Sequence, residues 1–217
     1  MHPLQSHILK ELNLKEKARY AELKPHGIES NKFVYHLNRV MKDGLVNKSG
    51  PGYFLTAPGK RYVGRLSLKS FLPRLQPIIV TTIIARDDEG NYLLMKSKRQ
   101  PFLGKVSFPY GKIHFGESIL EAAHRELKEK TGLTAQLEHR GDMYLAIKEQ
   151  GELVAHMLCH VFEGSKPQGQ IIPETKTHSI SWQILESVGS KSFVPGFLQM
   201  HKLYSKSKGK FFAEKIV

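Results

Sequence analysis

Cysteine and long apolar runs are the scarcest features of this 217-residue sequence. Its single cysteine, Cys159, excludes an intramolecular disulfide and is typical of a protein from a reducing compartment. The first residues lack the apolar core of a signal peptide. The longest aliphatic run, Ile78–Ala85, is far shorter than the ~20 residues that a membrane helix needs. We therefore expect a cytoplasmic protein that does not bind a membrane.

Acidic residues are also in short supply, and the shortage is uneven. The chain has 33 Lys/Arg against 20 Asp/Glu, for a net charge of +13. Residues 1–76 hold 14 of the basic and 5 of the acidic residues (net +9), and the remainder holds 19 and 15 (net +4). A basic N-terminal third favours a polyanionic partner. If charge alone is considered, a well-solvated basic surface is an equally good explanation.

The length allows two small domains, and the first third has its own pattern of helices and strands. Apolar residues at helical spacing predict helices near residues 4–12 and at Ser30–Lys42, with a short segment at 18–23 between them. Residues 45–48 and 53–56 flank a Ser-Gly-Pro-Gly turn and predict a β-hairpin. A last helix is expected near residues 59–66.

This order resembles a winged helix-turn-helix domain, which we assign to residues 1–68, followed by a linker at residues 69–77. In that family the second helix of the motif enters the major groove of double-stranded DNA, commonly as part of a dimer. The resemblance implies that Ser30–Lys42 reads DNA and that the hairpin forms a wing. The candidate contacts are Asn31, Lys32, Tyr35, His36, Arg39 and Lys42 in the helix and Lys48 in the wing. A winged helix used for dimerisation or other protein contacts is the alternative.

A cluster of carboxylates follows a glycine-bearing loop in the second part of the chain. Ser118 and Glu121 are spaced as a capping box at the start of a helix, and Gly132 can supply its left-handed end. Glu126 and Glu129 are three residues apart and share one face of that helix. Two carboxylates beside free backbone carbonyls suit Mg²⁺ or Mn²⁺, which would neutralise a diphosphate and activate water.

The same segment resembles the Nudix box. That pattern is Gly, five residues, Glu, seven residues, Arg-Glu, an aliphatic residue, any residue, Glu-Glu, any residue, Gly and an aliphatic residue. The matching positions are Gly111, Glu117, Arg125, Glu126, Leu127, Glu129, Gly132 and Leu133. Lys130 stands where the family has the second Glu of its pair. An ordinary amphipathic helix with a Glu126–Lys130 pair would account for Lys130 but not for the upstream Gly and Glu.

The Nudix resemblance implies hydrolysis of a nucleoside diphosphate derivative by attack of water on phosphorus. The implied metal ligands are Glu126, Glu129 and the carbonyl oxygen of Tyr110. Arg125 would orient the carboxylates, with Glu117 bracing the loop against the helix. The implied nucleotide contacts are Gly111, Lys112 and Lys130.

Lys130 leaves two interpretations open. It removes an anionic ligand and adds a cation, which weakens metal binding unless Glu152 or Glu174 substitutes. Alternatively, its ammonium group binds substrate phosphate directly. We favour a nucleotide-sensing transcriptional regulator with weak or lost hydrolysis, and the alternative is an active Mg²⁺-dependent Nudix pyrophosphohydrolase.

The predicted fold class is α+β, with the winged helix-turn-helix followed by a Nudix α/β/α sandwich at residues 78–204. Strands are expected at residues 78–85 and 92–95, as a hairpin, and at residues 106–110, 153–162 and 180–185. Residues 205–217 are expected to form a basic tail, of which the low-complexity stretch 205–210 is expected to be mobile. His156 and His160 share a strand face but are ~13 Å apart, too far to chelate one ion.

Overall fold

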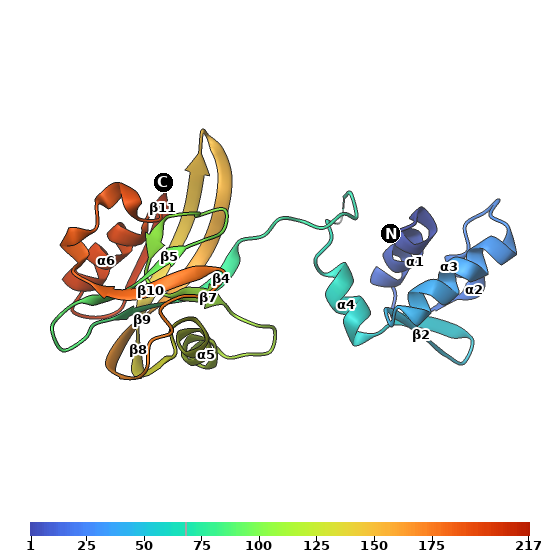
Figure 1. Ribbon diagram of the computed structural model, residues 1–217. Coiled ribbons are helices and arrows are strands. Elements are labelled where there is room, and N and C mark those ends of the chain that lie inside the picture. Colours follow the sequence, from blue (N-terminus) through green and yellow to red (C-terminus); the bar gives the residue numbers. More distant parts are fainter. Residues whose placement is uncertain (68) are drawn as a thin grey trace. The chain divides into compact units, whose positions relative to one another are not determined.

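A computed structural model describes residues 1–67 and 69–217 (Figure 1). The chain divides into two compact units, Met1–Leu75 and Gln76–Val217, and each is described by itself. The predicted domain boundary at residue 68 lies outside the described residues. The segment after it belongs to the N-terminal unit, because Phe71 packs against the core of that unit and the amide of Arg74 donates to the carbonyl of Arg65 at 3.1 Å.

The N-terminal unit contains the predicted helices and hairpin, together with a short additional strand. Its elements are α1 (Pro3–Asn13), β1 (Ala18–Arg19), α2 (Tyr20–Leu23), α3 (Ser30–Lys42), β2 (Val46–Ser49), β3 (Gly52–Leu55) and α4 (Ala57–Val63). The strands form an antiparallel sheet in the order β1-β3-β2. Apolar residues of α1 and α3, among them Ile8, Leu9, Phe33 and Leu37, form one buried cluster with the sheet.

The C-terminal unit is built on two sheets and two α-helices. Its strands are β4 (Ile78–Ala85), β5 (Tyr92–Ser97), β6 (Val106–Ser107), β7 (Tyr110–Lys112), β8 (Leu133–Glu149), β9 (Glu152–Gly169), β10 (His178–Gln183) and β11 (Phe211–Ile216). The five-stranded sheet has the order β11-β8-β9-β4-β7, and the three-stranded sheet has the order β10-β5-β6. The helices are α5 (Ile119–Thr131) and α6 (Phe197–Lys206). Strands β8 and β9 form a long hairpin whose turn projects from the unit (Figure 1).

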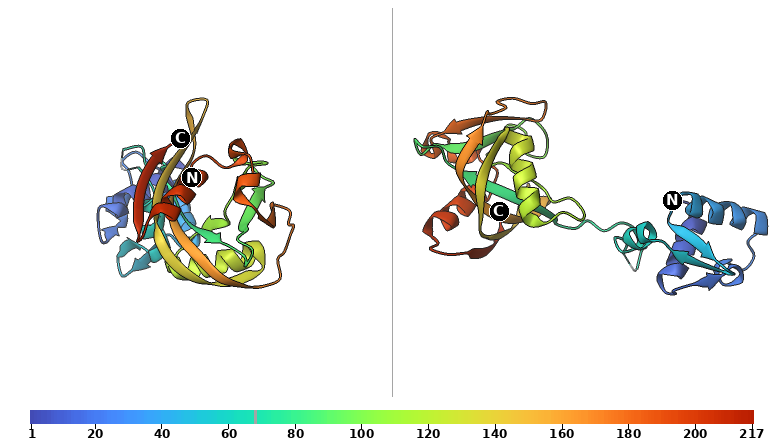
Figure 2. Two further views of the ribbon diagram at one scale, coloured as in Figure 1. Left: turned by 90° about the vertical axis from the view of Figure 1, so that its left-hand side faces the viewer. Right: turned by 90° about the horizontal axis from the view of Figure 1, so that it is seen from below.

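Helices α5 and α6 cover opposite faces of the five-stranded sheet (Figure 2). In β4, Ile83 packs in one buried cluster with Leu127 of α5, whereas Val80 packs in another with Phe197 of α6. The two β4 residues are separated by an odd number of positions, so their side chains point to opposite faces. The result is a mixed α+β unit with helix, sheet and helix layers.

The predicted hairpin between residues 78–85 and 92–95 is wrong. Strand β4 pairs in parallel with β9 and antiparallel with β7, while β5 pairs with β10 and β6 in the other sheet. Within the described structure, strand pairing between the two segments is limited to one antiparallel bridge between Arg86 and Tyr92. The turn at residues 87–91 therefore passes the chain from one sheet to the other.

The predicted basic tail at residues 205–217 is wrong for residues 211–216, which form a strand. Strand β11 pairs in parallel with β8, placing Phe212 opposite Asp142, and Phe211 and Ala213 pack against the core. The basic residues before β11 dominate the composition of this segment, so the short apolar part of the strand was not recognised in the sequence. Among the described residues, no helix combines the length and apolar character needed to cross a bilayer.

Candidate active site

The carboxylate of Glu126 lies directly against the backbone of Gly111. A Cβ atom built on Gly111 would be 1.8 Å from the Cδ atom of Glu126, so only glycine leaves room for this contact. Glu126 is 5% exposed, although carboxylates are rarely buried without a partner. The predicted capping box of Ser118 and Glu121 is confirmed and starts the helix that carries Glu126 to this position.

The guanidinium group of Arg125 holds the acidic residues of the site together. Its Nε and Nη2 atoms donate to the two carboxylate oxygens of Glu117 at 2.7 and 2.8 Å. Its Nη1 atom donates to Oε1 of Glu126 at 2.7 Å and to Oε2 of Glu129 at 3.2 Å. A further bond from Nη2 reaches the carbonyl of Lys112 at 3.0 Å. One planar fork thus fixes the glycine-bearing loop to the helix.

These bonds set the charge state of the brace. The hydrogen bonds from Arg125, followed by the one from the amide of His114, lower the pKa of Glu117 to about 2. The same contact with Glu117 raises the pKa of Arg125. The Glu117 carboxylate and the Arg125 guanidinium are therefore both charged at neutral pH and form an ion pair.

The second oxygen of Glu126 has no hydrogen bond. Its buried Oε2 atom finds no donor among the described residues, and the Nζ atom of Lys130 lies 3.9 Å away. Buried carboxylate oxygens are normally satisfied, so this atom is suited to a ligand that is not part of the chain. The Glu129 side chain is 57% exposed and shares the same Arg125 contact. Together the two carboxylates form an all-oxygen donor set of the kind that Mg²⁺ and Mn²⁺ prefer.

The carbonyl of Tyr110 is available at a free sheet edge. Two backbone groups that flank it in the sequence bond to β4. The carbonyl of Pro109 accepts from the amide of Ile83, and the amide of Ile113 donates to the carbonyl of Ile79. Backbone groups alternate in direction along a strand, so the Tyr110 carbonyl points away from β4. Because β7 is the last strand of its sheet, this oxygen does not take part in strand pairing on that side.

The Lys130 side chain is 27% exposed and lies one helical turn beyond Glu126. Its backbone carbonyl accepts a hydrogen bond from the ring of His178 at 2.9 Å, with Nε2 as the donor. The two acids considered as replacements have other neighbours. Glu174 is paired with Lys98, and Glu152 lies opposite Glu149 at the hairpin turn.

The structure places most of the predicted α3 side chains at the surface. The exposed ones are Asn31, Lys32, Tyr35, Arg39 and Lys42. Lys48 is exposed on β2, and its Nζ atom lies 5.6 Å from the ring centroid of Tyr53. His36 does not belong to this set. It is only 8% exposed, its ring stacks on that of His2 at 3.8 Å, and burial lowers its pKa.

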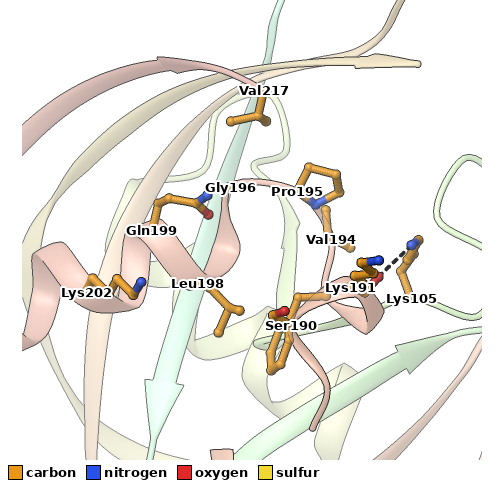
Figure 3. Close-up of a pocket in the computed structure, with 11 residues that line it drawn as sticks. Lys105, Ser190, Lys191, Val194, Pro195, Gly196, Leu198, Gln199, Lys202 and Val217 are labelled. Carbon is orange, nitrogen blue, oxygen red and sulfur yellow. Dashed lines mark hydrogen bonds between the residues drawn. The ribbon is translucent and has the colours of Figure 1, made fainter. Parts of the chain in front are cut away.

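A separate depression of about 560 Å³ lies at the start of α6 (Figure 3). It is lined by Lys105, Ser190, Lys191, Phe193, Val194, Pro195, Gly196, Leu198, Gln199, Lys202 and Val217. Among these lining residues, the Nζ atom of Lys105 donates to the carbonyl of Lys191 at 2.8 Å (Figure 3). None of the predicted site residues lines this depression, so it is distinct from the site around Glu126.

Comparison with known proteins agrees with this geometry. A model of the NUDIX domain matches residues 76–201. An ADP-ribose pyrophosphatase from Methanocaldococcus jannaschii is 37% identical over 95 residues, which cover 42% of this chain and 55% of that protein. The chain thus spans about half the length of this relative. A putative 8-oxo-dGTP diphosphatase from Bacillus subtilis is 34% identical over 101 residues, covering 46% of this chain and 62% of the relative.

The fold agrees as well. The crystal structure of a MutT protein from Bacillus halodurans has a TM-score of 0.54 and 25% identity, covering 64% of this chain and 89% of that one.

Proposed function

The chain belongs to the Nudix family, and we propose that it is a hydrolase that cleaves a nucleoside diphosphate derivative with Mg²⁺ or Mn²⁺. The observation that carries this proposal is the buried Oε2 atom of Glu126, which is held in place but not hydrogen-bonded. The two relatives are named for activities on ADP-ribose and 8-oxo-dGTP, and these compounds are therefore the first to test.

Each residue of the proposed site would have a separate role in hydrolysis. Glu126, Glu129 and the Tyr110 carbonyl would hold the metal, whose charge would neutralise the diphosphate and favour ionisation of water. Each carboxylate oxygen can accept two bonds, so Glu126 would bind the metal through Oε1 beside Arg125 and leave Oε2 to accept a proton from the attacking water. The water oxygen then forms its bond to phosphorus as the anhydride bond breaks, and the bridging oxygen departs with the leaving phosphate.

Lys130 would act on the substrate. Its ammonium group lies beside Glu126, where an incoming diphosphate would bring negative charge. A fixed cation there offsets part of that charge, in place of the anionic ligand that the family pattern has at this position. This role is compatible with turnover, whereas a purely inhibitory Lys130 is not.

The test is a substrate panel with the full-length protein. ADP-ribose, 8-oxo-dGTP and related nucleotides are incubated with Mg²⁺, with Mn²⁺ or with a chelator, and the products are quantified. We expect metal-dependent cleavage of the diphosphate of at least one compound. Thermal stabilisation by a nucleotide without any turnover would contradict hydrolysis and support a nucleotide sensor instead.

A second function is favoured by the N-terminal unit. We propose that this unit is a winged helix-turn-helix that binds double-stranded DNA, which would make the protein a nucleotide-responsive transcriptional regulator. The support is the element order, the β1-β3-β2 sheet and the exposed polar face of α3. The excess of basic residues in this part of the chain adds electrostatic attraction to phosphate.

This proposal predicts salt-sensitive DNA binding by the full-length protein. Replacing Arg39 with Ala should weaken binding, because the side chain is exposed on α3 and its pair with Asp43 is a surface contact. The matched control is Lys10→Ala, which removes one positive charge from α1. Equal effects of the two substitutions, or no binding at low salt, would contradict the assignment of α3 to the major groove.

A further inference from the structure

Two histidines and an aspartate that do not belong to the Nudix box meet on β8 and β9. The Nδ1 atom of His160 lies 2.6 Å from Oδ1 of Asp142, and the Nε2 atom of His139 lies 2.9 Å from the same oxygen. One ligand atom from each of the three residues lies within 4.8 Å of the others. The side chains are partly exposed, at 28% for His139, 32% for Asp142 and 13% for His160.

A β-bulge assembles this group. Asp142 lies opposite His160 in the register of β8 and β9, so these two side chains share a face. His139 is three residues from Asp142 and would point to the other face of a regular strand. The register shift between His139 and Gly141 turns it back, and Arg140 points away toward Glu163.

The bulge is held by a close backbone contact. Gly141 has φ +153, and a Cβ atom built on it would lie 2.3 Å from the carbonyl oxygen of Phe211 in β11. A side chain at this position would push β11 away from β8. Glycine at position 141 thus lets β11 pack closely against β8 beside the bulge that brings His139 to Asp142.

We infer that His139, Asp142 and His160 form a binding site for a transition-metal ion of the Zn²⁺ class. Two imidazole nitrogens and one carboxylate oxygen are the donors that Zn²⁺ and similar ions take, and three protein ligands leave a further position open for water or a ligand. Bonds from Zn²⁺ to nitrogen or carboxylate oxygen are ~2.0–2.2 Å long. The two ring nitrogens already contact the Asp142 oxygen, so the ion would fit if these three ligand atoms moved slightly apart. Mg²⁺, in contrast, prefers oxygen ligands.

The proposed site is separate from Glu126 but lies on the same sheet face. His160 is opposite Thr81 of β4, and Thr81 is opposite Gly111 of β7, which contacts Glu126. Adjacent strands are ~4.8 Å apart, so the Cα atoms of His160 and Gly111 are roughly 10 Å apart. The two sites would hold different metals, one with nitrogen and oxygen donors and one with oxygen donors alone.

The test is Zn²⁺ binding by the full-length protein with Mg²⁺ in excess, measured against a chromophoric chelator. We expect His139→Gln, Asp142→Asn and His160→Gln each to lose one equivalent of Zn²⁺ relative to the wild type. The control is His156→Gln, which removes a histidine from the same face of β9, where it contacts Tyr144, and should bind as the wild type does. Circular dichroism checks that each variant is folded.

A second measurement separates this site from the proposed active site. Glu126→Gln should retain the Zn²⁺ equivalent whether or not it affects hydrolysis. With Co²⁺ in place of Zn²⁺, the wild type should show a visible absorption band that His160→Gln lacks. Equal Zn²⁺ binding by the wild type and His160→Gln would overturn the inference, and so would a wild type that binds no Zn²⁺. In either case the triad would be a hydrogen-bonded group only.

Discussion

Replacing Lys130 with Glu tests how the substituted position of the Nudix box works. The Nζ atom of Lys130 lies 3.9 Å from Oε2 of Glu126, one of the carboxylates that would hold the metal. At an effective dielectric near 20, a unit charge ~5 Å from a divalent ion interacts by ~7 kcal/mol. Solvent screening and the flexible side chain reduce this strongly, since Lys130 is 27% exposed. Even ~1.4 kcal/mol of remaining effect corresponds to about tenfold in an equilibrium constant.

We therefore expect Lys130→Glu to lower the Mg²⁺ concentration for half-maximal activity by at least about tenfold. The rate at saturating Mg²⁺ should fall, because the cation that faces the substrate phosphate is lost. Lys130→Gln should lie between the two proteins in Mg²⁺ dependence. Lys148→Glu is the control, since it makes the same charge change at an exposed position on β8. An unchanged Mg²⁺ dependence in Lys130→Glu would refute the electrostatic reasoning, and a higher rate at saturating Mg²⁺ would refute the substrate role of Lys130.

Two further predictions concern the packing of the site. Gly111→Ala should lower activity by about 100-fold, because its Cβ atom displaces the Glu126 carboxylate and a misplacement of ~1 Å has effects of that size; Gly209→Ala, where no atom lies within 4 Å of a new Cβ, should leave the activity unchanged. Glu117→Gln should lower the melting temperature near neutral pH. The pKa of Glu117 is about 2 in the folded chain and ~4.3 when unfolded, so the difference from wild type should be full above pH ~4.3 and vanish as the pH falls toward ~2. A difference that is independent of pH would show that the Arg125 pair does not stabilise the fold.

Local signals in the sequence were enough to predict the helices that carry the candidate sites. The capping box at Ser118 and the left-handed Gly132 are confirmed, and they bound α5 where the pattern expects. Helix α3 likewise spans Ser30–Lys42, because its apolar residues repeat at helical spacing. His36 was misplaced because it is one position from the exposed Tyr35, and a helix turns by ~100° at each residue.

The strands were harder to predict because their partners are distant in the sequence. Strand β8 was not predicted because the polar stretch at residues 139–142 and its bulge interrupt the alternation of apolar and polar residues. Helix α6 and strand β11 were also missed, since the basic residues between them dominate the composition. The group of His139, Asp142 and His160 depends on a bulge, and a glycine inside the strand was its only sequence signal.

If Glu126 is the catalytic carboxylate of a metal-dependent hydrolase, Glu126→Gln should abolish most of the activity. The substitution keeps the shape of the side chain but removes the charge and the proton acceptor. With ADP-ribose or whichever panel compound the wild type cleaves, we predict a loss of at least ~10²-fold in kcat at saturating Mg²⁺. Glu138→Gln, an exposed carboxylate on β8, should retain the wild-type rate. A Glu126→Gln protein that cleaves the substrate at the wild-type rate would show that Glu126 is not the catalytic carboxylate.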